Sequence, residues 1–203
     1  MPLKVQQKLL NVIYGHGRGW AFSQKDLLAL GSRDAVDKAL HRLAAKNVIR
    51  RVMRGIYDYP RYSEAIGSIM SPDIDQVVQA LARKFGWDVQ PSGPAALNLL
   101  GLSSQVPGRY VFMSDGPSRS YKVGGTEIQF RHTALKESGF KQWESQVIVQ
   151  ALKSLGEERI DDAAISRIRT WLDPAKRDKV LKDTRTVTGW TYEAIRRICL
   201  ERS

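Results

Sequence analysis

Residues 32–57, SRDAVDKALHRLAAKNVIRRVMRGIY, decide the expected fold of the N-terminal part of the chain. Ser32 is a favourable helix N-cap, and apolar residues then recur at helical spacing from Arg33 to Lys46. Two β-prone runs follow and flank Arg54-Gly55, an arrangement typical of a β-hairpin. Apolar and polar residues alternate irregularly along these runs, so we expect a bulge. The stretch therefore predicts a helix followed directly by a basic hairpin.

The residues before this stretch predict two further helices. An apolar stripe starts at Val5 and stops at the glycine-rich run 15–19, residues 20–22 suit a short strand, and Ser23 can cap a second helix. Helix, strand, helix, turn, helix and basic hairpin is the order of a winged helix-turn-helix, whose third helix lies in the major groove of duplex DNA. We therefore expect such a DNA-binding domain over residues 1–61.

The helix over residues 33–46 has two different faces. Its apolar residues cluster on one side at 100° per residue and should be buried, which leaves the polar side for DNA. The side chains that we expect to contact DNA lie on this polar side, at the helix N-terminus and on the hairpin: Ser32, Arg33, Lys38, His41, Arg42, Arg50, Arg51 and Arg54. Asp34 and Asp37 repel phosphate, so the hairpin should supply more of the phosphate attraction than the helix.

Positive charge is concentrated at the N-terminus. The 203 residues carry a net charge of +11. Residues 1–61 hold 12 Lys/Arg and 4 Asp/Glu, a net of +8, while residues 62–141 have a net of +1 and residues 142–203 a net of +2. A protein that is basic throughout would spread its charge evenly. The asymmetry therefore indicates one localised module for binding a polyanion such as DNA.

Two stretches of the chain resemble AbiEi-type antitoxins. The first comprises FS at 22–23, GS at 31–32, ALHRL at 39–43, VIRR at 48–51 and RGIY at 54–57; the second is PSGPAALNLLGL at 91–102 followed by QVP at 105–107. Both stretches lie within residues 22–107, and the second is the more discriminating. AbiEi-type proteins are winged-helix partners of AbiEii-type nucleotidyltransferase toxins in bacterial abortive-infection, type IV toxin-antitoxin loci. The resemblance implies a repressor of its own operon that recognises inverted repeats in double-stranded DNA and counteracts a cognate toxin.

The rest of the chain completes an expected α+β fold. Residues 62–141 predict a small α+β domain, with a helix over 73–86 and a hairpin at Gly124-Gly125. Residues 142–203 predict a helical C-terminal region that packs on this middle domain. The resemblance implies that these two segments form one antitoxin unit.

We expect no catalytic residue, cofactor or metal site. His16, His41 and His132 are far apart and lack metal-ligand spacing with Cys199, while the acids at 157–158 and 161–162 suit a helix start. The glycine-rich run lacks the Gly-Lys-Ser/Thr ending of a phosphate-binding loop. No run of 18 apolar residues suits a bilayer and no signal peptide is recognisable, so we expect a cytoplasmic protein without a membrane partner.

Two other functions remain open. The chain could be a stand-alone winged-helix transcription regulator whose C-terminal region senses a ligand or dimerises. It could also be a nuclease that uses the winged helix only for targeting, although no cluster of carboxylates or histidines supports this. An adjacent nucleotidyltransferase gene would favour the antitoxin over the stand-alone regulator.

Overall fold

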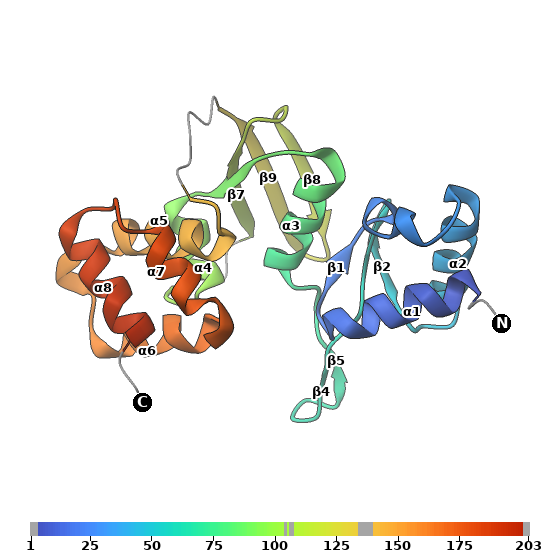
Figure 1. Cartoon of the computed structure of the whole chain (residues 1–203), viewed down its shortest axis with the longest axis horizontal. Helices are drawn as coiled ribbons and strands as arrows, with labels where there is room; N and C mark the ends of the chain where they lie inside the picture. Colours follow the sequence, from blue (N-terminus) through green and yellow to red (C-terminus); the bar gives the residue numbers. More distant parts are fainter. Residues whose placement is uncertain (1–3, 104, 106–107, 134–139, 201–203) are drawn as a thin grey trace. The chain divides into compact units, whose positions relative to one another are not determined.

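The computed structural model describes residues 4–103, 105, 108–133 and 140–200. Residues 106–107 of the second stretch of resemblance therefore lie outside the described residues. The fold is mixed α+β, as expected (Figure 1). The chain divides into two compact units: residues 1–87 with 121–125, and residues 88–120 with 126–203.

The first unit begins with three helices and a small sheet. Its elements are, in chain order, α1 (Val5–His16), β1 (Ala21–Phe22), the 3-10 helix η1 (Gln24–Leu30), α2 (Arg33–Ala45), β2 (Arg50–Met53), β3 (Ile56–Asp58), β4 (Tyr62–Ser63), β5 (Ser68–Ile69) and α3 (Ile74–Phe85). The sheet has the order β1-β3-β2 and is antiparallel. The expected order of helices and strands up to the basic hairpin is confirmed, although the second helix is of the 3-10 type.

The first three helices share one apolar core. The stripe that starts at Val5 contributes Leu9 and Ile13, and α2 contributes the face that the sequence predicted. The fully enclosed members of this core are Leu9, Ile13, Phe22, Leu27, Val36, Ala39, Leu40, Leu43 and Ile49. Burying a side chain of this size stabilises a fold by about 1.5–3 kcal/mol, so this cluster fixes α2 and leaves its other face to solvent.

Helix α3 belongs to the first unit, which differs from the boundary expected at residue 61. Arg83 donates from Nε to Asp26 Oδ1 at 2.8 Å and from Nη2 to the Ala21 carbonyl at 2.8 Å. Lys84 Nζ donates to the Arg54 carbonyl at 3.3 Å. These bonds, together with the buried apolar face of α3, join the helix to the N-terminal elements. The sequence could not show them because each joins residues 30 to 62 positions apart.

The remaining elements form a sheet followed by a helical region. They are β6 (Val89–Pro91), α4 (Gly93–Leu99), β7 (Arg109–Ser114), β8 (Arg119–Val123), β9 (Thr126–His132), α5 (Trp143–Leu155), η2 (Glu157–Arg159), α6 (Asp162–Trp171), η3 (Pro174–Lys176), α7 (Arg177–Asp183) and α8 (Gly189–Leu200). The sheet order is β6-β7-β9-β8, with β7 and β9 parallel. The expected turn at Gly124-Gly125 and the helical C-terminal region are confirmed.

The core of the second unit is built mainly from helices α4 to α8. Its buried members include Ala96 on α4, Leu100 directly after α4, and Ile195 on α8. Helix α5 contributes Val147, Ile148, Val149, Ala151 and Leu152. Cys199 also lies in this cluster, as its position on an apolar stripe predicted. The helical C-terminal region therefore packs on the second stretch of resemblance, which supplies α4.

Candidate nucleic-acid interface

Helix α2 presents a polar face to solvent. Arg33, Lys38, His41 and Arg42 are all exposed, while Val36 and Leu40 on the opposite face are fully buried. Among the described residues, none of these four polar side chains takes part in a hydrogen bond or ion pair. The two faces are therefore as the sequence predicted, and the polar side chains can reach an external ligand.

The N-terminus of α2 has the expected cap. Ser32 Oγ accepts a hydrogen bond from the Ala35 amide at 3.4 Å, so this hydroxyl is engaged in capping although it is exposed. Asp34 and Asp37 are also exposed, which confirms a polar face of mixed charge. At the other end, Asn47 adopts a left-handed conformation with a φ of +55°, which Asn tolerates and which turns the chain from α2 toward β2.

The hairpin of β2 and β3 carries two exposed arginines. Arg51 lies on β2 and Arg54 lies in the turn, where Gly55 has a φ of +75° that glycine adopts without strain. The register of the strands shifts between Arg51 and Met53, which confirms the expected bulge. Lys84 holds the turn through the Arg54 carbonyl, and burial, followed by the charge of Arg54, lowers the pKa of Lys84. The turn therefore has a fixed position, and its guanidinium is exposed.

Arg50 occupies a different environment from the other arginines of the hairpin. Its Nε and Nη2 donate to the two carboxylate oxygens of Asp58 at 3.0 and 2.5 Å, and its Nη1 donates to the Met70 carbonyl at 2.8 Å. The Asp58 side chain is 2% exposed. We expected Arg50 on the DNA-binding surface, but its contacts favour a structural role. It joins β2 to β3 and to the segment after β5.

The first unit also contains two basic residues that we did not single out, Arg18 and Lys46. The Arg18 guanidinium lies 4.7 Å from the centre of the Tyr59 ring and donates to the Pro60 carbonyl at 2.8 Å. Lys46 is exposed immediately after α2. Charge density was the only signal for these residues, because both lie within the segment of net charge +8.

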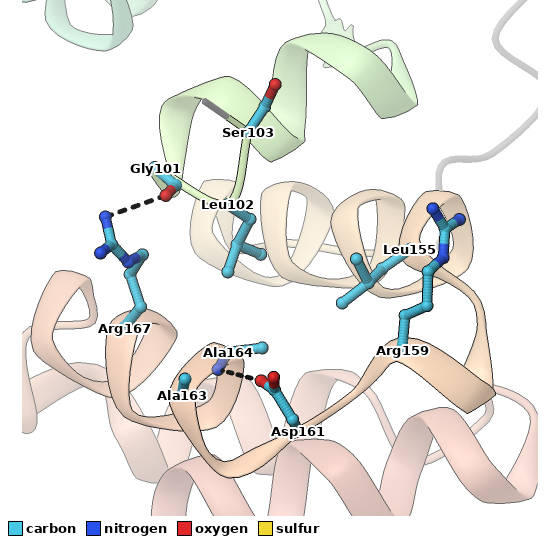
Figure 2. A pocket seen from close by; sticks show the side chains of 9 residues that line it. All are labelled: Gly101, Leu102, Ser103, Leu155, Arg159, Asp161, Ala163, Ala164 and Arg167. Carbon is cyan, nitrogen blue, oxygen red and sulfur yellow. Dashed lines mark hydrogen bonds between the residues drawn. The ribbon is translucent and has the colours of Figure 1, made fainter. Parts of the chain in front are cut away.

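The second unit contains a hollow between the end of α4 and the start of α6 (Figure 2). The hollow has a volume of about 530 Å³. Arg167 Nη1 donates to the Gly101 carbonyl at 2.9 Å, and Asp161 Oδ1 accepts from the Ala164 amide at 2.7 Å (Figure 2). Asp161 therefore caps α6, as predicted for the paired acids. The nine described lining residues include no histidine or cysteine, so they offer no imidazole or thiol.

Metal-ligating side chains and the cysteine are further candidates for chemistry. In the part of the chain that the structure describes, no group of three or more His, Cys, Asp or Glu side chains could hold a metal ion. Cys199 is 8% exposed, and burial raises its pKa to about 11, so at neutral pH it is a thiol and not a nucleophilic thiolate. Among the described residues, no helix is both long enough and apolar enough to cross a membrane.

The geometry defines an α+β protein whose N-terminal unit exposes basic side chains on one helix face and on the following hairpin. Residues 8–180 match a family described as "Family of unknown function (DUF6088)". This match covers most of both units, and the chain belongs to that family. A search of curated proteins finds no match.

Proposed function

We propose that residues 1–61 form a winged helix-turn-helix domain that binds duplex DNA, with α2 as the recognition helix and β2–β3 as the wing. The observation that carries this proposal is the exposed face of α2, where Lys38, His41 and Arg42 lie opposite a fully buried apolar face. The basic hairpin follows in the same unit. A recognition helix followed by a basic hairpin is the arrangement with which helix-turn-helix proteins of the winged type contact DNA.

The dimensions and chemistry of α2 suit the major groove. Its 13 residues span about 20 Å, and Ala45 on the exposed side permits close approach. Arg42 can donate two hydrogen bonds to the major-groove edge of guanine, and Lys38 can bind a guanine edge or a phosphate. Arg33, at the helix N-terminus, is placed for a phosphate. Arg51 and Arg54 supply contacts to the backbone or minor groove, which do not depend strongly on sequence.

Loss of the α2 side chains should weaken specific binding. We expect Lys38→Ala and Arg42→Ala each to lower affinity for a selected DNA site by about 5- to 150-fold, the range for one base contact. The DNA site is first selected from a random pool by its binding to the full wild-type chain. The affinity of each variant for this site is then measured by fluorescence anisotropy at fixed salt. Lys153→Ala, which removes an exposed charge on α5, is the matched control. Affinities of both α2 variants within twofold of wild type would refute the groove assignment.

We further propose that the protein represses its own operon and counteracts a cognate nucleotidyltransferase toxin. The two stretches of resemblance to AbiEi-type antitoxins support this, and the second of them supplies α4 in the core of the second unit. A stand-alone regulator with a sensing or dimerising C-terminal region is the alternative. An antitoxin needs the second unit for neutralisation, whereas a plain repressor has no effect on a toxin.

Coexpression with the product of the adjacent gene distinguishes the antitoxin from the stand-alone regulator. If the proposal holds, the wild-type chain restores growth of cells that express the toxin. The double variant Lys38→Ala/Arg42→Ala should restore growth equally well, because its second unit is unchanged. Copurification then distinguishes a direct complex from indirect antagonism. Absence of rescue by the wild-type chain, with the protein present at normal level, would refute the antitoxin and favour the regulator.

A further inference from the structure

The hairpin of β4 and β5 projects from the first unit (Figure 1). Tyr62 pairs with Ile69, Ser63 pairs with Ser68, and the Met70 amide donates to the Arg61 carbonyl at 2.9 Å. Four large apolar side chains are exposed on these few residues: Tyr62 at 54%, Ile66 at 67%, Ile69 at 57% and Met70 at 43%. Single exposed apolar residues are ordinary, but a cluster of four marks an interaction surface.

The base of this hairpin is fixed while its tip is exposed. Arg50, held by Asp58, donates to the Met70 carbonyl at 2.8 Å, and Arg61 lies 3.4 Å from the Asp73 carboxylate. An isolated two-stranded hairpin is marginally stable in water and has open edges that can pair with another strand. The fixed base therefore presents an apolar arm that further pairing would stabilise.

The outer edge of β5 can accept another strand. Because the Met70 amide donates to Arg61, the neighbouring pair of Tyr62 and Ile69 is of the type that does not exchange hydrogen bonds. The amide and carbonyl of Ile69 therefore point away from β4. Two antiparallel copies of β5 can exchange these two bonds around a two-fold axis at Ile69, which is the self-complementary arrangement of a symmetric dimer.

The charge of the arm favours a second copy as the occupant. Residues 62–72 contain one charged side chain, Glu64, whereas residues 1–61 carry a net charge of +8. Two such basic segments repel each other, so two copies can meet most easily through a surface without positive charge. The same lack of positive charge makes the arm unsuited to DNA or to an anionic membrane. A symmetric dimer also suits a helix-turn-helix, since dimers read two half-sites related by two-fold symmetry.

We propose that the β4–β5 hairpin is a dimerisation arm through which two copies of the chain associate. Strand β5 pairs with its copy, and Tyr62, Ile66 and Ile69 pack across the two-fold axis. The evidence for this pairing comes from the β4–β5 hairpin alone. Its consequence, that two α2 helices reach two half-sites of DNA together, rests on the proposed function.

A charge swap at Ile69 tests the pairing. Sedimentation equilibrium of the full chain should give a dimer for wild type and at least 100-fold weaker self-association for Ile69→Lys and for Ile69→Glu. An equimolar mixture of these two variants should recover the dimer, because opposite charges then meet at the axis. Leu28→Lys, an exposed apolar residue elsewhere in the first unit, should remain dimeric. Far-UV circular dichroism checks that each variant is folded.

Each part of the proposal is refuted by a different result. A monomeric wild-type chain refutes the dimer, and a dimer that persists in both Ile69 variants refutes this surface. A mixture that stays monomeric refutes the contact between the two copies of Ile69. DNA binding is measured separately: both Ile69 variants should bind a single half-site like wild type and lose cooperativity on two half-sites. A chain that dimerises through the arm but binds no DNA refutes the proposed function and leaves the dimerisation arm intact.

Discussion

Replacing Arg50 with alanine should lower the free energy of unfolding of the first unit by about 2–4 kcal/mol, whereas replacing Arg51 should change it by less than about 0.5 kcal/mol. The two arginines are adjacent on β2, but only Arg50 neutralises the Asp58 carboxylate, which is 2% exposed. Removing Arg50 leaves that carboxylate buried without its partner, and this desolvation is costly. The Arg50 side chain is 29% exposed, so we place the loss below that of a fully buried pair.

Urea unfolding followed by amide hydrogen exchange over residues 50–58 measures this loss in the full chain. Arg50→Lys is an informative companion, because lysine keeps the charge but cannot bind the carboxylate with two parallel bonds. It should retain part of the stability lost in Arg50→Ala. If Arg50→Ala were as stable as wild type and bound DNA weakly, Arg50 would belong to the DNA-binding surface after all.

The sequence predicted the local features of the first unit well. The buried face of α2 follows directly from the spacing of Val36, Ala39, Leu40 and Leu43, because helical periodicity decides which side chains share a face. The bulge in the β2–β3 hairpin followed from irregular alternation, and the N-cap at Ser32 from a side chain that can accept an amide hydrogen bond. Each of these features depends on residues within a few positions of one another.

The features that the sequence did not predict depend on distant residues. Arg50 has the same residue type and the same hairpin context as Arg51, and only the fold shows that Asp58 and Met70 lie beside it. The attachment of α3 to the first unit depends on Arg83 and Lys84, which reach carbonyls and a carboxylate far back in the chain. The parallel pairing of β7 with β9 likewise bypasses β8. No local pattern encodes these partners.

The different contacts of the three hairpin arginines also change which of them we expect to bind DNA. With Arg50 engaged internally, the β2–β3 hairpin keeps two exposed arginines, Arg51 and Arg54, which we expect to contact phosphate. Lys84 donates to the Arg54 carbonyl and so restrains the backbone of this turn, which lowers the backbone entropy lost when the turn binds. Together with the acids at 34 and 37 on α2, this makes the wing the main expected source of salt-dependent affinity.

The double variant Arg51→Ala/Arg54→Ala should therefore lose about 10- to 100-fold in affinity for every DNA sequence tested. The slope of log K against log salt should become shallower by about 2, since each lost phosphate contact releases about one counterion fewer. Binding titrations at several salt concentrations measure both quantities. Arg51→Lys/Arg54→Lys keeps the two charges and should preserve the slope. Lys153→Ala/Arg185→Ala removes two exposed charges from the second unit and should leave both quantities near wild type. An unchanged salt slope combined with altered sequence preference would show that the wing reads bases instead of binding phosphates.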